Sequence, residues 1–316
     1  MTEIELNRSN HLIDPQLHVW GWEIPVYLFL GGITAGLMIF STLLAWRVPE
    51  AERTRWARWL PLSAPLVLSL GMLALFLDIE LKRHVFRFYT AFRVTSPMSW
   101  GSWILVLIYP VTMLLGLAQL TDDEAARLGR WGPVRALRLG RLVDWLRGGA
   151  RGSTGALRWA ALVLGIALGG YTGILLGTLG ARPAWSSSML GPLFLVSGFS
   201  TGAALVMLLP VGQREHHLLR RWDMGAIGLE LVLLGLFILG LVTTGGESGR
   251  QATALFLGGT YTASFWALVV IAGLLVPLLI EGVESVRGLR PSFAAPLLLL
   301  LGGLSLRWIL VVAGQA

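Results

Sequence analysis

The side chains of this 316-residue chain that could hold a ligand and move protons gather where long apolar runs begin or end. Residues 96–103 read Ser-Pro-Met-Ser-Trp-Gly-Ser-Trp, at the start of an apolar run that continues to Leu120. The preceding segment, 78–93, carries charges of both signs and His84. A plain membrane anchor has no need of so polar an entrance. It suits a site that takes an amphiphilic ligand from the bilayer and passes protons to water.

The composition predicts an all-α, polytopic membrane protein. Hydrophobic residues make up 55% of the chain and charged residues 14%, and the 14 Trp and 39 Gly are typical of membrane helices with interfacial anchors and close packing. A helix needs roughly 20 apolar residues to cross a hydrocarbon layer of about 30 Å. We therefore expect a bundle of eight transmembrane helices, at residues 24–46, 60–81, 100–120, 157–179, 189–211, 222–244, 254–280 and 292–313.

The expected organisation is an external N-terminal arm, 1–23, followed by the transmembrane domain, 24–316. Most Lys and Arg residues fall in the connections after the first, third, fifth and seventh spans. The longest of these, 121–156, is predicted to hold a basic amphipathic helix on the membrane surface. The positive-inside rule makes these connections cytoplasmic and both termini periplasmic, in the cell inner membrane. Placed in this way, the net charge of +7 favours the lipid bilayer over nucleic acid as a partner.

Two residue types are informative by their absence. The chain has no cysteine, so it can form no disulfide and supply no thiolate to zinc or to an iron–sulfur cluster. None of its five histidines lies in the core of an expected span, whereas two membrane haems would normally need four axial ligands there. Adjacent His216 and His217 are expected in a basic loop. We therefore expect no haem and no metal site.

Polar side chains inside hydrocarbon are costly, so their positions carry information. A quinone site needs a long apolar slot, a donor for each carbonyl oxygen, and a carboxylate or His to move protons. On the expected topology these residue types lie together toward the external face and predict a quinone site there. The candidates are Glu23, Tyr27, Asp78, His84, Ser99, Trp100, Tyr171 and Arg307.

Each candidate also has a simpler interpretation. Glu23 could begin the first helix in water, and Asp78 could only pair with Lys82 one turn on. Tyr171 could be an ordinary core tyrosine, and Arg307 could extend to the interface. The fourth span carries a stripe of glycines every four residues from 165 to 177, which predicts close packing on one face. Tyr171 is roughly opposite that stripe and is expected to face a different neighbour.

Four segments, in order along the chain, resemble the NrfD/PsrC family of integral membrane subunits of polysulfide-reductase-type complexes. Residues 20–36 resemble the family's first helix and residues 96–103 its third-helix entrance. Residues 170–204 resemble its fourth and fifth helices, and residues 304–315 its last helix.

The resemblance implies a subunit that binds a quinone, menaquinone or ubiquinone, near the external face and carries no haem. It implies electron exchange with a four-cluster iron–sulfur subunit on that face, which relays to a molybdenum- or tungsten-pterin catalytic subunit. A tyrosine on the family's fourth helix helps to bind the quinone, and Tyr171 matches it. Polar residues at the start of the first helix contribute too. Here those positions offer Glu23 and Tyr27, where some members have Asn or His.

The sequence thus predicts the quinone-reactive subunit of a respiratory oxidoreductase, active only within its complex. Tyr171 and Glu23 are expected to hold the quinone oxygens, and Asp78 and His84 to exchange protons. Arg307 is expected to stabilise an anionic quinol by its charge.

Three further carboxylates, Asp223, Glu230 and Glu281, lie toward the cytoplasmic side and are predicted to conduct protons. Two rival functions stay open. A proton-coupled secondary transporter would favour repeated halves and helices broken near the midplane, and no repeat is evident. A passive membrane anchor of a redox complex would leave the polar cluster unexplained.

Overall fold

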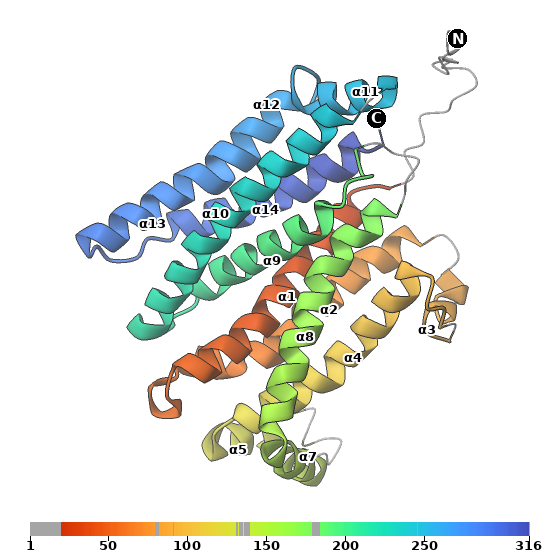
Figure 1. The fold of residues 1–316 in the computed structure, drawn as a ribbon. Helices are drawn as coiled ribbons and strands as arrows, with labels where there is room; N and C mark the ends of the chain where they lie inside the picture. Colours follow the sequence, from red (N-terminus) through yellow and green to blue (C-terminus); the bar gives the residue numbers. More distant parts are fainter. Residues whose placement is uncertain are drawn as a thin grey trace.

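The computed structural model of the chain is entirely helical in the part that it describes (Figure 1). The N-terminal arm up to residue 19, together with Glu80 and Arg182, lies outside the described residues. The structure describes residues 20–79, 82–90, 92–130, 132, 135, 140–178, 184–244 and 246–315.

Eight helices of the described residues are long and apolar enough to cross a membrane, as predicted. They are α1 (Glu23–Arg47), α2 (Arg55–Asp78), α4 (Pro97–Gln119), α8 (Thr154–Gly177), α9 (Leu190–Met207), α10 (Gln213–Thr243), the continuous helix Thr262–Arg287 and α14 (Ala294–Ala313). The continuous helix consists of α12 (Thr262–Ser264), the π-helical η3 (Phe265–Leu275) and α13 (Val276–Arg287).

Shorter helices connect these spans at the two ends of the bundle. They are η1 (Glu50–Glu52), η2 (Lys82–His84), α3 (Arg87–Thr90), α5 (Asp122–Arg130), α7 (Gly140–Gly152) and α11 (Gly246–Phe256). We call the end that carries the start of α1 and the end of α14 the terminus end. The opposite end, with α5 and α7, is the arginine-rich end (Figure 1).

The spans form two groups that meet along α1, α8 and α9. In the first group α1, α2, α4 and α8 pack on one another, and in the second α9, α10, η3, α13 and α14 do so. Helix α9 packs on both α1 and α8, and α14 also packs on α1. Figure 1 shows the groups side by side, red to green and green to blue. Helix α1 therefore belongs to the first group and also packs on two helices of the second.

Glycines bring the backbones of α1 and α9 into direct contact. A Cβ atom added at Gly202 would lie 2.5 Å from the Cα of Gly36, and one added at Gly198 would lie 3.0 Å from the Cα of Gly32. Because lipid offers little hydrophobic drive for helix association, contacts of this kind hold membrane helices together. The predicted glycine stripe of α8 packs in the same way. For example, a Cβ at Gly165 would lie 3.0 Å from the carbonyl oxygen of Ala35 in α1.

The terminus end is closed by contacts between the first and last described residues. The backbone N–H of Trp20 donates to the side chain of Gln315 at 2.8 Å, and Gln315 donates back to the Trp20 carbonyl at 3.1 Å. The indole of Trp185 stacks on Trp20 with ring centroids 5.1 Å apart and donates to the Leu310 carbonyl at 2.7 Å. These contacts tie the start of α1 to the end of α14.

Helix α10 begins nine residues before the predicted start at 222, so the expectation of a basic loop there was wrong. Its first turns contain His216 and His217. The fully buried carboxylate of Glu215 accepts bonds from Gly212 N at 2.8 Å, Thr54 N at 2.9 Å and Thr54 Oγ1 at 2.7 Å. A capping carboxylate at a helix start satisfies free N–H groups, and here it joins α10 to the start of α2.

The seventh span also differs from its prediction, at 262–287 rather than 254–280. Residues up to Phe256 belong to α11, and a turn with Gly258 at φ 122° separates the two helices. A residue with that φ is best accommodated by glycine, which explains why an apolar run breaks there.

The described residues of the basic segment after α4 include two helices, α5 and α7, where one amphipathic helix was predicted. Burial alone would raise the pKa of Glu124 in α5, but hydrogen bonds from Arg58 and Thr121 lower that pKa to about 2. The Glu124 carboxylate therefore stays ionised and fixes α5 to α2.

The contact between α1 and α9 predicts a position-specific effect of adding one methyl group. We expect Gly202→Ala to lower the free energy of unfolding by roughly 1–3 kcal/mol, because the new Cβ would meet the α1 backbone, which cannot rotate away. Gly235→Ala in α10 is the control, since a Cβ there meets nothing within 4 Å. Thermal unfolding in detergent measures both variants. Equal unfolding temperatures would contradict the proposed close packing.

Candidate functional site

A cavity of about 590 Å³ lies among α1, α2, α4 and α8, near the terminus end. Most of its lining is apolar, contributed by side chains such as Leu73, Leu105 and Leu175. Its volume falls within the range of about 300–1,000 Å³ that is typical of small-molecule sites. The lining residues with polar side chains are Trp20, Ser69, Asp78, Ser102 and the four tyrosines Tyr27, Tyr89, Tyr109 and Tyr171.

Four of the five tyrosines of the chain thus line one cavity. Tyr27 and Tyr171 were predicted, whereas Tyr89 of α3 and Tyr109 of α4 were missed. The hydroxyls of Tyr109 and Ser69 lie 3.0 Å apart and form a hydrogen bond across α4 and α2. The residue type was a signal that could have found them. Tyrosine is rare in this chain, and it is the side chain that joins an aromatic ring to a hydroxyl donor.

The phenol ring of Tyr171 packs directly against a glycine of the neighbouring helix α4. A Cβ atom added at Gly101 in α4 would overlap the phenol ring and hydroxyl of Tyr171. Tyr171 is almost fully buried, with 7% of its surface exposed, and Tyr27 is at 3%. The predicted orientation of Tyr171, away from the glycine stripe, is therefore confirmed. Residues 96–103 line the cavity through Met98 and Ser102, and Gly101 contributes by making room for Tyr171.

Several other candidates lie beside the cavity and do not line it. The hydroxyl of Ser99 accepts a hydrogen bond from the Arg93 N–H at 3.0 Å and so holds the segment that enters α4. Trp100 is 42% exposed on the outside of α4. His84 lies exposed in η2, with its ring 6.5 Å from that of Phe86.

The two candidate carboxylates of this end differ in position. Asp78 is the last residue of α2 and lines the cavity. Glu23 is the first residue of α1 and half-buried, and its side chain is not among the lining groups, although Trp20 and Ile24 are. Of the eight predicted candidates, three therefore line the cavity, namely Tyr27, Asp78 and Tyr171.

Arg307 is completely buried between α1, α9 and α14, and the alternative that it extends to the interface does not hold. Its guanidinium donates to the carbonyls of Leu28 at 3.2 Å, Phe194 at 3.4 Å and Gly303 at 2.8 Å, and to Ser197 Oγ at 3.1 Å. A buried charge is tolerated only when its donors are satisfied in this manner. Arg307 is separated from the cavity by α1, whose Leu28 touches both.

Three buried carboxyl groups lie in the second group of helices. Glu230 of α10 is near Arg307 and within hydrogen-bonding reach of Ser197. Toward the arginine-rich end, Asp223 accepts a hydrogen bond from Ser200 at 2.7 Å and faces Glu281 of α13. Beyond the contact between the two carboxyl groups, Asp223 Oδ2 and both oxygens of Glu281 receive no hydrogen bond from the described residues.

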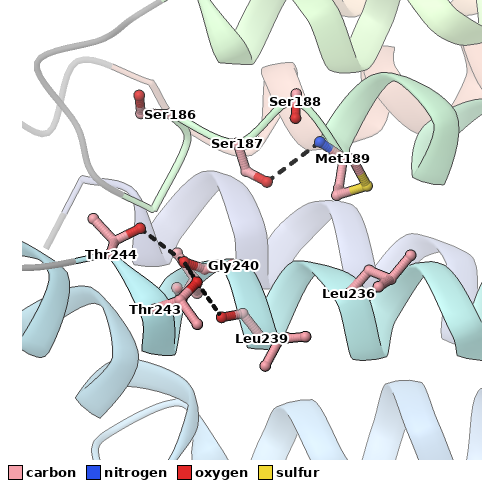
Figure 2. Close-up of a pocket in the computed structure, with 10 residues that line it drawn as sticks. Ser186, Ser187, Ser188, Met189, Leu236, Leu239, Gly240, Thr243 and Thr244 are labelled. Carbon is pink, nitrogen blue, oxygen red and sulfur yellow. Dashed lines mark hydrogen bonds between the residues drawn. The ribbon is translucent and has the colours of Figure 1, made fainter.

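A second cavity, of about 600 Å³, lies at the terminus end between the start of α9 and the end of α10 (Figure 2). It is lined by Ser and Thr hydroxyls and by leucines, without a titratable group. Three of its hydroxyls are engaged in local hydrogen bonds. Thr243 and Thr244 donate to carbonyls of their own helix, and Ser187 accepts from the Met189 N–H. The tyrosine-lined cavity is therefore the stronger candidate for chemistry.

The profile of the family described as "Polysulphide reductase, NrfD" matches residues 10–316. The chain belongs to this family. It is 32% identical to protein NrfD of Escherichia coli (strain K12) over 308 residues, 94% of this chain and 95% of that protein. It is 28% identical to the C polypeptide of polysulfide reductase from Wolinella succinogenes over 313 residues, 94% of each protein.

Identity to the C component of selenate reductase from Mesobacillus selenatarsenatis is 25% over 319 residues, 93% of this chain and 73% of that protein. The family resemblance seen in the sequence is thus confirmed. Together with the eight apolar helices, membership of the NrfD family indicates a multi-pass membrane protein that serves as a subunit of a reductase complex.

The contacts of Arg307 predict a structural role within this NrfD-family fold. We expect Arg307→Lys to lower the free energy of unfolding by about 2–4 kcal/mol, because a single ammonium group cannot replace hydrogen bonds that diverge toward three helices. The exposed Arg290 provides the control, as Arg290→Lys. Thermal unfolding measures both. An Arg307→Lys protein with wild-type stability would contradict the role in packing.

Proposed function

We propose that the tyrosine-lined cavity binds a quinone or quinol, and that the protein exchanges its two electrons and two protons with partner subunits and water. The observation that carries this proposal is the combination of four tyrosines and Asp78 on the wall of an otherwise apolar cavity between membrane helices. The apolar walls fit a hydrophobic ring and tail. Phenolic hydroxyls fit the two carbonyl oxygens as donors.

Each polar group has a specific proposed role. Tyr171, held against Gly101, donates to one quinone oxygen, and Tyr27, on the facing helix α1, donates to the other. Asp78 accepts protons at the mouth of the cavity, near the terminus end, and passes them to water. Glu23 and His84 lie outside the lining and extend this exit toward the surface.

The electrons require a partner because the protein has no cysteine with which to bind an iron–sulfur cluster. We place an iron–sulfur subunit at the terminus end, over the segment 82–100, with a molybdenum- or tungsten-pterin subunit beyond it. Lys82, Arg83 and Arg87 are exposed there beside Phe86 and Phe92, at 55% and 58% exposure. Aromatic and arginine side chains at a surface are typical of protein interfaces. In this arrangement both termini are periplasmic, in the inner membrane.

Quinol oxidation by the purified complex tests the cavity. We expect Tyr171→Phe to weaken quinone affinity by about 5- to 30-fold, the effect of losing one buried hydrogen bond of roughly 1–2 kcal/mol. Tyr261→Phe is the matched control, because Tyr261 is the one tyrosine of the sequence absent from the cavity lining. Gly101→Ala should weaken affinity as well, since its methyl group displaces the Tyr171 ring.

The same variants, together with purification of the protein, separate the rival functions. If Tyr171→Phe combined with Glu23→Gln left turnover and quinone affinity unchanged, the proposed site would be wrong. A protein that purifies alone and transports a solute would support a secondary transporter. A complex whose turnover is insensitive to every cavity variant would support a passive anchor.

We further propose that the buried carboxyl groups carry protons from the arginine-rich end toward the cavity. Asp223 Oδ2 and both oxygens of Glu281 receive no hydrogen bond from other groups of the described residues. Two carboxyl groups that face each other in this way cannot both be ionised in a low dielectric, so we assign one shared proton to Asp223 and Glu281. Ser200 touches Asp223, and Ser197 lies about one turn further along α9, between Glu230 and Arg307. Arg307 then contacts the Leu28 carbonyl, next to Tyr27.

Proton uptake by the complex in liposomes tests this path. We expect Glu281→Gln to reduce proton uptake on the arginine-rich side at least tenfold during turnover, while quinone affinity stays unchanged, because the variant removes the exchangeable proton without touching the cavity. Glu52→Gln is the control, because Glu52 is an exposed carboxylate of the same end that forms an ion pair with Arg214. Full proton uptake by the Glu281→Gln complex would make the path wrong and leave the quinone site intact.

A further inference from the structure

Helix α7 turns an apolar stripe away from the protein. Trp145 is 74% exposed and Leu142 is 47% exposed, and Leu146 continues the stripe at helical spacing. The opposite face docks on the rest of the protein. There the buried Arg147 donates to the Leu120 carbonyl and to Asp122, each at 2.7 Å. The helix therefore docks through a polar contact and leaves Leu142 and Trp145 exposed, unlike a helix that packs its large apolar side chains on a soluble core.

An apolar cleft of about 730 Å³ lies beside this stripe, between α7 and the ends of α4 and α8. Its lining includes Leu114 of α4, Leu157 of α8, and Asp144, Trp145 and Leu146 of α7. The adjacent glycines of α7 keep the cleft open. A Cβ atom added at Gly149 would meet nothing within 4 Å. A flexible hydrocarbon tail could occupy this space without any change in the protein.

The charge of α5 and α7, the two helices at this end, is positive and partly uncompensated. Arg58 pairs with Glu124, and Arg147 and Arg151 pair with Asp122. In contrast, three arginines of α5 and α7 are exposed and make no ion pair with the described residues, and the exposed carboxylates of these helices outside those pairs are Asp123 and Asp144. The three arginines are Arg127, Arg130 and Arg141.

Exposed tryptophans place this region at a membrane surface. Trp46, near the end of α1, and Trp159, near the start of α8, are 40% and 60% exposed, and their ring centroids lie 4.9 Å apart. Tryptophan is enriched where a bilayer meets water. Trp159 follows Ser153, which precedes α8, by about 9 Å of helix. Helix α7 ends just before Ser153, so it lies at the same interface.

We infer that α7 and its cleft form a binding site for an anionic phospholipid. One acyl tail enters the cleft beside Leu114 and Leu157, and the apolar stripe enters the boundary of the acyl layer. The phosphate is attracted by Arg141 of α7 and by Arg127 and Arg130 of α5. An apolar stripe, an adjacent cleft and unpaired arginines at the interface together fit a lipid better than a soluble partner. This inference does not depend on the proposed quinone chemistry.

Thermal unfolding of the purified protein in mixed micelles tests the site. The probes are dioleoylphosphatidylglycerol, which is anionic, and dioleoylphosphatidylcholine, which is zwitterionic. We expect the anionic lipid to raise the unfolding temperature and the zwitterionic lipid to have little effect. Arg127→Glu combined with Arg141→Glu should raise the anionic lipid concentration for the half-maximal shift about tenfold or more. Increasing salt should weaken the wild-type response.

A second variant tests the cleft without changing charge. Gly149→Leu fills the cleft and should reduce the lipid response, whereas Gly235→Leu, also at an open position but on α10, should leave it unchanged. Equal responses to the two lipids, or an unchanged response of the arginine variant, would overturn the inference. Retention of a soluble protein at α7 that the anionic lipid does not displace would overturn it as well.

Discussion

The direct backbone contact between α1 and α9 is the constraint on which the rest of the structure depends. Two pairs of glycines, Gly32 with Gly198 and Gly36 with Gly202, let the helices approach until no side chain fits between them. Arg307 fills the space at one end of this contact, where a Cβ at Gly32 would lie 2.6 Å from its guanidinium. Packing and hydrogen bonding, rather than hydrophobic drive, thus fix the junction of the two helix groups.

At this junction two neighbouring residues of α1 make contacts on opposite sides of the helix. Tyr27 lines the cavity, whereas the carbonyl of the next residue, Leu28, accepts a hydrogen bond from Arg307 on the other side. A displacement of Arg307 would therefore be transmitted to the cavity wall through a single turn of α1. Helix α1 meets α9 through these glycine pairs and meets α8 through Gly165, so glycine contacts hold the helices that carry Tyr27 and Tyr171 against each other.

The sequence was sufficient to predict features that depend on local pattern. Apolar runs gave all eight spans, and the glycine spacing of α8 gave the orientation of Tyr171. Features that depend on contacts between distant segments were missed. Tyr89 and Tyr109 reach the cavity because the short helix α3 lies beside it and because α4 has a particular rotation, and neither feature is encoded locally. The early start of α10 depends on the contact between Glu215 and Thr54, which are far apart in sequence.

The charges of the second helix group follow from the burial of Arg307. Its guanidinium has three carbonyls and a hydroxyl as acceptors, and of the described carboxylates Glu230 is the one whose charge acts on it. Ser197 lies between the two and keeps them from direct contact. Removing either charge would leave the other buried without compensation, which is more costly than losing the pair. No hydrogen bond from a cation of the described residues reaches Asp223 or Glu281, and the proton path proposed above assigns them a shared proton instead. The two carboxyl sites therefore differ in their surroundings, because Glu230 lies near a buried cation, whereas Asp223 and Glu281 face each other.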